Sequence, residues 1–361
     1  MATFASTVDE ELTRCIAEAS ELNGIKKPKP KASGPRTFDY PEGFKPIMAV
    51  IPLISCEMNL PIRVFAKSDW PEYLQKLIPA VDPDYIFNPD ATLAVVAELF
   101  TTKPRKSVGS VLIHGKKGSG KSTLFEQICA RINMPFIRVN CKLDMESAAL
   151  FGGIKYDPIN GMAWVNGPVA ELGSLGGFLL IDEASRIPSG IMDSMMGVLE
   201  KNSKIYLADK PGTSDEKFIT PNEWFRIGLT DNTELQGDTT GKYVSANVQD
   251  EALIDRIETT YRLDYLDEAH ELAIITGKVK DIDNVSARRM IALAKMVREA
   301  YDGGNIGFTM SPRGLLNWAE KSVFWQSERK AFKLAFFNKL TVTDQQVVAE
   351  FYHSVFAENL R

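Results

Sequence analysis

Hydrophobic and polar positions follow two different patterns along this chain, and the change falls near residue 265. From about residue 107 to residue 265, short apolar runs alternate with stretches of helical spacing, which is typical of an α/β fold with a parallel sheet. The runs that predict strands are Ser110–His114, Phe136–Asn140, Phe178–Ile181, Lys204–Ala208 and Trp224–Thr230. Beyond Tyr265 the spacing is helical only, so we expect the α/β domain to be followed by an all-helical lid.

Capping patterns mark where several of the helices begin. Ser311 before Pro312 is typical of an N-cap followed by proline, and Thr343 with Gln346 forms a capping-box pattern. The spacing predicts another helix from Asn88 onward, ahead of the first strand. The helices expected in the lid are 267–276, 285–301, 312–325 and 343–358.

The N-terminal part of the chain has a different character. Residues 7–23 show the spacing of a short amphipathic helix, and residues 25–36 are rich in lysine and proline and contain no acid. Proline removes amide donors and like charges repel, so the second stretch is expected to be an extended linker. The pattern leaves open whether the helix docks on the main body or binds another protein. We therefore expect a helix, a linker, a lead-in, an α/β nucleotide-binding domain and a lid over residues 1–24, 25–43, 44–87, 88–265 and 266–361.

The composition is that of an ordinary globular protein. Of the 361 residues, 44% are hydrophobic and 25% are charged, which excludes a disordered, collagenous or disulfide-scaffold chain. No apolar run approaches the ~18–20 residues that cross a bilayer. The first residues lack the basic stretch and apolar stretch of a secretory signal. These patterns predict a cytoplasmic protein without a membrane segment.

Charge and metal-ligand spacing narrow the function further. The net charge of -5 argues against nucleic acid as a general partner. Neither the four cysteines nor the three histidines show the spacing of a zinc site, so reduced and mostly buried thiols are expected.

Residues 115–122 match the phosphate-binding pattern G-x-x-x-x-G-K-[ST] at every fixed position. An apolar strand precedes them and a helical pattern follows. Glycines let consecutive backbone N–H groups curl around phosphate oxygens, and the helix N-terminus adds partial positive charge. Lys121 is expected to bridge the β- and γ-phosphates and Ser122 to ligate Mg²⁺. The residues expected to hold ATP are Gly115, Lys116, Lys117, Gly118, Ser119, Gly120, Lys121, Ser122 and Thr123.

Two carboxylates follow the apolar strand 178–181. Ligands of parallel α/β sheets bind at the C-terminal ends of the strands, which is where Asp182 and Glu183 stand. Asp182 is placed to hold the Mg²⁺ ion together with Ser122, and Glu183 is placed to polarise the attacking water. With the phosphate-binding pattern upstream, this arrangement predicts binding and hydrolysis of a nucleoside triphosphate.

Three further residues occur in a common order after these two motifs. Asn232 ends the strand 224–230, and its carboxamide is suited to orient the attacking water beside Glu183. Arg256 follows a helical stretch, and Arg313 opens a lid helix. A planar, always-charged guanidinium suits a γ-phosphate. Singly, each residue is explained as well by a turn or a surface ion pair, but their order favours a role in the site.

With these motifs in this order, the chain resembles the MoxR branch of the AAA+ ATPases, and within it the small ATPase subunits of aerobic cobaltochelatases. The most specific stretches are 82–87, 92–94, 237–243 and 311–313. The resemblance implies a Walker A motif with Lys121 and Ser122, and a Walker B motif with Asp182 and Glu183. It also implies that Asn232 is sensor 1, that Arg313 is sensor 2, and that Arg256 is the arginine finger supplied to a neighbouring subunit. One departure is Asp231, which adds a carboxylate near the site.

The resemblance further implies an assembly and partners. The expected assembly is a homo-oligomeric ring, a hexamer, with ATP between the subunits. The expected partners are a protein with a metal-ion-dependent adhesion-site domain and a large chelatase subunit that inserts cobalt into a corrin ring. Residues 148–165 resemble an insertion in helix 2 that forms a hairpin facing the ring pore, with Asn160-Gly161 as its turn. Tyr156 or Trp164 would then grip a client, or else simply pack the hairpin.

Other functions remain open at this stage. A MoxR-type chaperone that remodels an unrelated protein complex would share the same ATPase residues. A nucleic-acid motor or loader is disfavoured because the chain is acidic and lacks a basic stripe interleaved with aromatic residues. A scaffold that uses nucleotide only as an assembly switch is disfavoured by the complete set of Glu183, Asn232 and Arg256.

Overall fold

The structure, a computed structural model, describes residues 40–53, 60–101, 108–158, 161–237 and 247–360. The expected N-terminal helix and residues 25–39 of the expected linker lie outside these ranges, and so does most of the stretch 237–243. None of the helices in the described ranges is long and apolar enough to cross a membrane.

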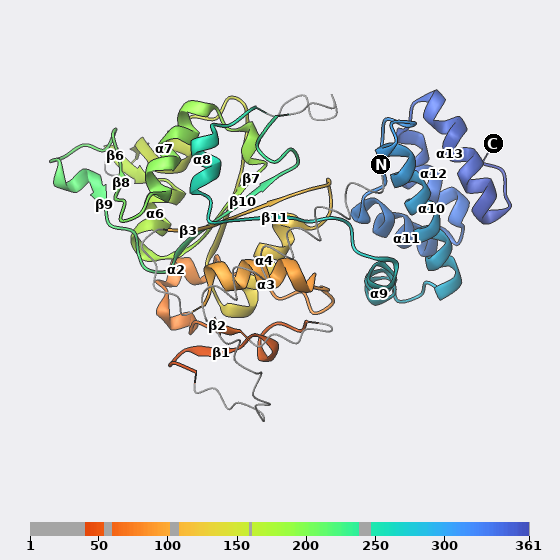
Figure 1. The fold of residues 1–361 in the computed structure, drawn as a ribbon, viewed down its shortest axis with the longest axis horizontal. Helices are drawn as coiled ribbons and strands as arrows, with labels where there is room; N and C mark the ends of the chain where they lie inside the picture. Colours follow the sequence, from red (N-terminus) through yellow and green to blue (C-terminus); the bar gives the residue numbers. More distant parts are fainter. Residues whose placement is uncertain (1–39, 54–59, 102–107, 159–160, 238–246, 361) are drawn as a thin grey trace, which may run out of the picture. The chain divides into compact units, whose positions relative to one another are not determined.

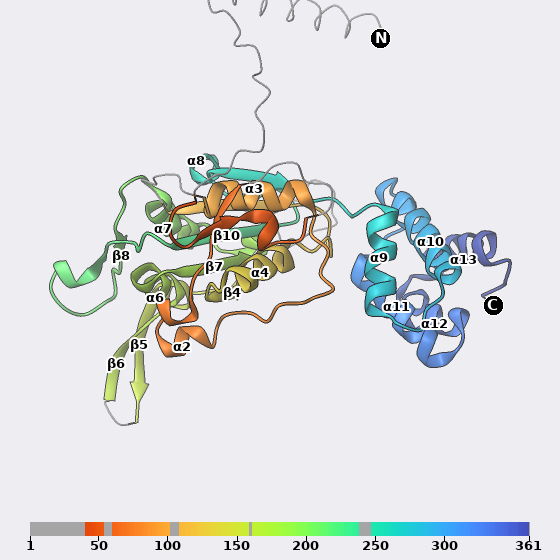
Figure 2. The ribbon, with the colours of Figure 1, turned by 90° about the horizontal axis from the view of Figure 1, so that it is seen from below.

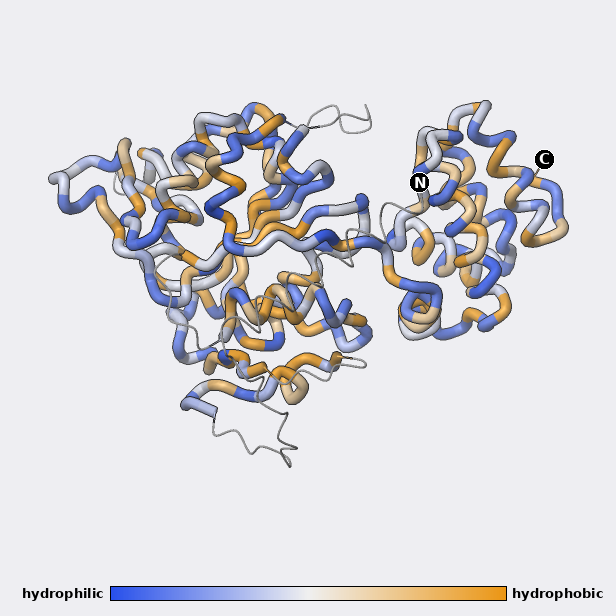
Figure 3. Tube along the Cα trace, viewed as in Figure 1, coloured by the Kyte–Doolittle hydropathy of each residue, from blue (hydrophilic) through white to orange (hydrophobic). Residues whose placement is uncertain are grey.

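A five-stranded parallel sheet forms the centre of the α/β domain. Its strands are β3 (Gly109–His114), β4 (Phe136–Asn140), β7 (Gly177–Asp182), β10 (Phe225–Asp231) and β11 (Thr259–Arg262), in the spatial order β11-β3-β10-β7-β4. Every residue of β3, β7 and β10 is buried, as expected of central strands in a parallel sheet. Figure 3 shows these strands coloured mainly as hydrophobic. The expected α/β fold with a parallel sheet is confirmed.

Several helices pack against this sheet. Helix α3 (Pro89–Leu99) contacts β3 and β11, while α4 (Lys121–Ile132) and α6 (Pro168–Leu175) contact β7 and β10 (Figure 1). The expected helix at Asn88 is confirmed, since the Asn88 side chain accepts a hydrogen bond from the Ala91 backbone N–H at 2.9 Å and caps α3. The other helices of this domain in the described ranges are α2 (Glu72–Gln75), α5 (Ala148–Phe151), α7 (Ser189–Leu199), α8 (Glu251–Arg256), η3 (Ala184–Arg186) and η4 (Asp215–Lys217).

The lead-in shares the hydrophobic core of the sheet. Strands β1 (Phe44–Pro46) and β2 (Pro61–Arg63) pair antiparallel. Side chains from this region, such as Ile47 and Trp70, are buried in the same cluster as the central strands. The 3-10 turns in the lead-in are η1 (Ile47–Ala49) and η2 (Lys67–Asp69). The lead-in therefore adds apolar area to the core of the nucleotide-binding domain.

Besides the β1–β2 pair, two antiparallel ribbons lie outside the parallel sheet in the described ranges. The expected hairpin is confirmed, with β5 (Gly152–Asp157) paired to β6 (Gly161–Asn166), and Figure 2 shows it extending away from the sheet. The strand expected at Lys204–Ala208 is wrong as a member of the sheet. Only β8 (Ile205–Tyr206) forms there, and it pairs antiparallel with β9 (Phe218–Ile219). A short apolar run has no periodicity that distinguishes a sheet strand from a two-residue ribbon.

The expected helical region after the sheet is confirmed. Its helices are α9 (Glu268–Lys278), α10 (Asn284–Asp302), α11 (Pro312–Trp325), α12 (Glu328–Ala335), α13 (Val342–Phe356) and the turn η5 (Phe337–Lys339). Their buried side chains, from Ile275 to Leu360, form a cluster separate from that of the sheet. Helix α12 was not expected. The Thr343 capping box is also wrong, because the cap of α13 is Thr341, whose hydroxyl accepts from the Asp344 N–H at 3.2 Å.

A buried ion pair stabilises the helical region. The Arg298 guanidinium donates to both carboxylate oxygens of Glu271 at 2.8 and 2.9 Å and to the Met310 carbonyl at 2.8 Å. Arg298 is 8% exposed and Glu271 is 4% exposed. Removal of one partner leaves an uncompensated buried charge, so Arg298→Met is expected to lower the free energy of unfolding by ~3–5 kcal/mol.

Urea denaturation of the full chain measures this loss. The matched control is Arg288→Met, because Arg288 pairs with Glu268 at 3.6 Å while both side chains are about 60% exposed. Such surface pairs contribute ~0–1 kcal/mol. Equal losses in the two variants would contradict the assigned role of the buried pair.

Candidate active site

The loop between β3 and α4 needs glycine at several positions. Gly115, Gly118 and Gly120 have φ angles of 136°, 77° and 93°, which side chains rarely adopt. A Cβ atom at Gly115 would lie 2.3 Å from the Leu263 carbonyl oxygen, and one at Gly118 would lie 2.6 Å from the Ser311 Cβ. The loop therefore has both the conformation and the close packing that require residues without side chains.

Lys121 is the first residue of α4, and its ammonium group points back into this loop. Its Nζ donates to the carbonyls of Gly115 and Lys116 at 2.7 and 3.0 Å, and to the Asn232 Oδ1 at 2.8 Å. Burial lowers the pKa of Lys121 to about 8, although nearby carboxylates, Asp231 foremost, act to raise it. The ammonium therefore still carries its charge at neutral pH, with all three donors directed at the site.

Asp182 ends β7, and both of its carboxylate oxygens accept hydrogen bonds. Its Oδ1 accepts from the Ser122 hydroxyl at 2.6 Å and from the Thr230 hydroxyl. Its Oδ2 accepts from Arg138 Nε at 3.0 Å and from Arg138 Nη2. Burial acts to raise the pKa of Asp182, but the hydrogen bonds from Ser122, Thr230 and Arg138 outweigh it and hold the pKa below its usual value. The carboxylate is thus ionised.

Glu183 follows Asp182 in an unusual backbone conformation. Its φ angle of 59° lies in the left-handed region, which costs a non-glycine residue ~1–3 kcal/mol. The Glu183 N–H donates to the Thr230 Oγ1 at 3.3 Å, and its side chain pairs with the Arg186 Nη1 at 2.8 Å. Thr230 therefore positions both acids of the motif, because its one hydroxyl contacts the side chain of Asp182 and the backbone of Glu183.

The strand end of β10 carries two polar side chains with different tasks. Asn232 faces Lys121, as described above. Asp231 is 1% exposed, and its Oδ2 accepts from the Thr233 N–H at 2.7 Å, the Thr233 hydroxyl at 2.8 Å and the Leu235 N–H at 3.0 Å. Burial acts to raise the pKa of Asp231, and these bonds together with one from Ser185 lower it overall. Asp231 thus fixes the turn after β10.

These groups surround a cleft of about 130 Å³. Its lining contains most of the residues that the sequence predicted for the site, including Glu183, Asn232 and Arg313. Gly115, Lys116 and Ser119 are not part of the lining. Arg256 is absent from it too: it ends α8 and pairs with Glu200 at 3.7 Å. The complete lining is Lys117, Gly118, Gly120, Lys121, Ser122, Thr123, Arg138, Asp182, Glu183, Thr230, Asp231, Asn232 and Arg313.

Comparisons with known proteins now give the family. Residues 110–257 match the family described as AAA domain (dynein-related subfamily), and residues 271–357 match the family described as CbbQ/NirQ/NorQ C-terminal. The chain therefore carries an AAA domain followed by a C-terminal region of the MoxR type.

Two relatives and one solved structure are among the proteins to which this chain is similar. Over 321 residues, 87% of this chain and 92% of the relative, the ATPase is 28% identical to the aerobic cobaltochelatase subunit CobS of a Sinorhizobium species. It is 34% identical to the uncharacterized protein YojN of Bacillus subtilis over 25% of this chain and 31% of that protein. A structure of the Saccharomyces cerevisiae Hsp104:casein complex aligns with 74% of this chain and 48% of that chain, with 16% identity and a TM-score of 0.43.

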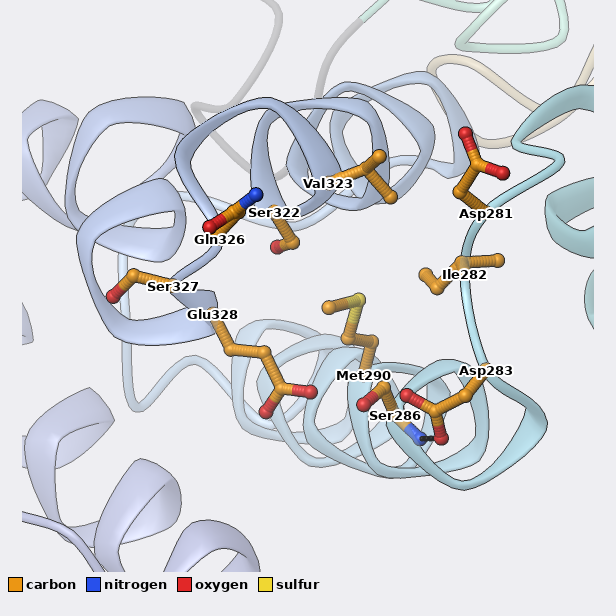
Figure 4. A pocket seen from close by; sticks show the side chains of 10 residues that line it. All are labelled: Asp281, Ile282, Asp283, Ser286, Met290, Ser322, Val323, Gln326, Ser327 and Glu328. Carbon is orange, nitrogen blue, oxygen red and sulfur yellow. Dashed lines mark hydrogen bonds between the residues drawn. The ribbon is translucent and has the colours of Figure 1, made fainter.

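A second cavity in the ATPase, of about 390 Å³, lies among the lid helices. Figure 4 shows the carboxylates of Asp281, Asp283 and Glu328 around it. It is larger than the cleft at the glycine loop, but its carboxylates would repel phosphate groups. The smaller cleft, with Lys121 and Arg313 in its lining, is therefore the site that suits a nucleotide.

The hairpin presents its two aromatic residues in different ways. Tyr156 is 74% exposed and lies opposite Met162, which is 70% exposed. Trp164 is partly buried against the core of the sheet, and its indole N–H donates to the Asn166 side chain at 2.8 Å. Trp164 thus packs the hairpin, while Tyr156 is free to contact another molecule.

The sequence reasoning missed Arg138 and Thr230 as residues of the site. Both lie inside strands, and strand residues of these types have no motif of their own. The register of the sheet held a usable signal, because β4 pairs in parallel with β7 so that Asn140 is opposite Asp182. A polar side chain two residues before Asn140 then lies on the same strand face, near the acids. In the described part of the chain, no cluster of three or more metal-ligating side chains of His, Cys, Asp or Glu occurs.

Proposed function

We propose that the ATPase binds ATP with Mg²⁺ in the cleft at the glycine loop and hydrolyses it to ADP and phosphate. The observation that carries this proposal is the set of contacts at the strand ends: Ser122 and Thr230 on Asp182, and Lys121 on Asn232. These contacts bring the Lys121 ammonium and the Asn232 amide into one cleft with the Asp182 carboxylate and the two hydroxyls that it accepts from.

The residues present suit both a phosphate and a divalent cation. The Ser119 hydroxyl is buried and has no hydrogen-bond partner within the described ranges, so it is available to a phosphate oxygen. The backbone of Gly118 and Gly120 leaves no Cβ atom in the way. Asp182 and Ser122 offer the oxygen donors that Mg²⁺ prefers. When bound there, the ion would neutralise charge on the phosphates.

Each polar residue then has a task that follows from its position. Lys121 would release the loop carbonyls and Asn232 and donate to phosphate oxygens instead. Glu183 would accept the proton of the attacking water, and Asn232 would orient that water. Arg313 enters the cleft from the first turn of α11 and would meet phosphate charge with a bidentate guanidinium.

We further propose that the active assembly is a ring of six copies. Arg256 supports this proposal because it lies outside the cleft of its own chain. An arginine finger acts on the site of the adjacent subunit when it is supplied in trans. The site would therefore be complete only at a contact between two copies.

The work that hydrolysis drives is the remodelling of a partner complex. We propose that this work is cobalt chelation, the activity in the name of the CobS relative. As the family resemblance implies, a large chelatase subunit would then insert cobalt into a corrin ring, with a partner that carries a metal-ion-dependent adhesion-site domain. The identity over most of both chains supports this assignment. The exposed Tyr156 on the hairpin offers a contact for such a client.

Capture of the partners tests the client. Glu183→Gln is expected to bind ATP and stall, so the full chain with this change, purified from its native cell in the presence of ATP, should retain its partners. An adhesion-site-domain protein together with a large chelatase-like subunit is the expected result. The control is Lys121→Ala, which is expected to lose ATP and to retain neither. A different client without a chelatase-like subunit would leave the ATPase in place and favour a chaperone that acts on an unrelated complex.

A further inference from the structure

Arg138 occupies one oxygen of the central carboxylate of the site. Asp182 shares its Oδ1 between two neutral hydroxyls, whereas among the described residues its Oδ2 accepts only from the Arg138 guanidinium, through Nε at 3.0 Å and through Nη2. Arg138 is the only cation within ion-pair distance of Asp182 in the described part of the chain. Arg138 thus makes the one ion pair of this buried carboxylate in the described part of the chain.

The position of Arg138 leaves its guanidinium able to move. It projects from β4, the edge strand of the sheet, at a register position opposite Leu180. Its side chain is 43% exposed, whereas the side chain of Asp182 is 10% exposed. The acid is therefore fixed by the core, while the arginine approaches it from the open side of the cleft. A long, flexible cationic side chain in such a place can leave its partner without opening the fold.

A divalent cation and a guanidinium compete for the same carboxylate. Two cations on one oxygen pair repel each other, and the repulsion is strong where water is excluded. An arginine keeps its charge at any pH of interest, and its planar fork suits phosphate as well as carboxylate. The side chain already lines the same cleft as Lys121 and Arg313. An arginine that leaves Asp182 would therefore remain among the groups that face the nucleotide.

We propose that Arg138 is a displaceable counter-ion of Asp182: it holds the carboxylate before the nucleotide arrives, and it turns to the phosphates when a divalent cation takes the carboxylate. The inference rests on the proposed function of this cleft. It makes Arg138 a positioning residue that couples binding of the metal to binding of the nucleotide. Its consequence is that loss of the guanidinium has opposite effects on the two ligands.

Two binding measurements on the full chain test whether loss of the guanidinium changes the affinities for the metal and for the nucleotide in opposite directions. Without nucleotide, Arg138→Gln should bind Mn²⁺ at least ~10-fold more tightly than the unchanged chain, because Asp182 has lost its competing cation. With Mg²⁺ and a non-hydrolysable ATP analogue, the same variant should bind the analogue at least ~10-fold more weakly, because a phosphate partner is lost. Mn²⁺ binding is followed by electron paramagnetic resonance, and analogue binding by calorimetry.

Matched variants separate this role from a structural one. Arg288→Gln removes an exposed arginine of the lid and should change neither affinity. Arg138→Lys keeps a charge and should bind Mn²⁺ nearly as the unchanged chain does. In a chain that carries Asp182→Asn, the further change Arg138→Gln should leave Mn²⁺ binding unaltered, which makes the pair a double-mutant cycle and keeps the test valid should one single variant fold poorly.

The outcomes are distinct. Tighter Mn²⁺ binding with weaker analogue binding supports the exchange. A fall in both affinities, or Mn²⁺ binding that is unchanged in Arg138→Gln, overturns it and leaves a structural ion pair. Failure of the unchanged chain to bind the analogue at all would instead refute the nucleotide site, whatever the Mn²⁺ result.

Discussion

Arg256→Ala is expected to lower kcat for ATP hydrolysis by ~10³–10⁵ while ATP binding is retained, because an arginine finger stabilises charge that develops only in the transition state. Within its own chain, Arg256 lies at the end of α8, pairs with Glu200 and takes no part in the lining of the cleft. Its removal should leave the binding site of that chain unchanged. Steady-state hydrolysis and equilibrium ATP binding, measured on the same preparation, separate the two effects.

Mixing two inactive variants tests whether the finger acts between subunits. Lys121→Ala destroys the phosphate site but keeps Arg256, and Arg256→Ala keeps the phosphate site. In a mixed ring, an intact site of one variant can face the finger of the other, so part of the activity should return. Arg288→Ala, which removes an exposed arginine that is not part of the cleft lining, is the control and should remain fully active. Near-normal turnover of Arg256→Ala alone would refute the finger. Mixed rings without activity would contradict a finger that acts on the site of the neighbouring subunit.

The parts of the fold that sequence patterns predicted are those with strong local signals. The buried strands appear as continuous apolar runs because both faces of β3, β7 and β10 are covered. The glycine loop has a fixed spacing because positive φ angles and close contacts exclude other residues there. Such features depend on residues that are close together in the chain, so a single sequence is enough to predict them.

The features that sequence patterns missed depend on neighbours far apart in the chain. The run at residues 204–208 has the composition of a sheet strand, yet only two of its residues pair, and they pair with β9. Helix α12 follows α11 after Gln326, which adopts a left-handed conformation, and no glycine or proline marks the break. Its eight residues are fewer than the ~11–18 residues over which helical spacing is counted.

The same limit applies within the site. Lys121, Ser122 and Asp182 belong to motifs, but the partners that set the charge of Asp182 come from other strands. Arg138 and Thr230 reach it only because β4 and β10 flank β7 in the sheet. Strand order arises from packing of the whole domain, so sequence spacing alone does not bring these residues together.

Glu183→Gln is expected to lower the rate of hydrolysis by ~10²–10⁴ because a general base is removed. The amide has nearly the shape of the carboxylate, so the left-handed backbone and the N–H contact to Thr230 should persist. The variant loses its ion pair with Arg186, but the side chains are 37% and 43% exposed, and such pairs contribute ~0–1 kcal/mol. The fold and the ATP affinity should therefore survive the change.

A single-turnover measurement distinguishes loss of the base from loss of binding. ATP should remain uncleaved on the Glu183→Gln chain, with a dissociation constant within a few-fold of that of the unchanged chain. Glu268→Gln removes a carboxylate that is about 60% exposed on the lid, and it should hydrolyse ATP at the normal rate. Hydrolysis by Glu183→Gln within a few-fold of normal would mean that another group accepts the proton. Asp182 could not be that group while Ser122, Thr230 and Arg138 occupy its oxygens and lower its pKa. We therefore assign the role of the base to Glu183. In the described part of the chain, its carboxylate forms an ion pair with Arg186.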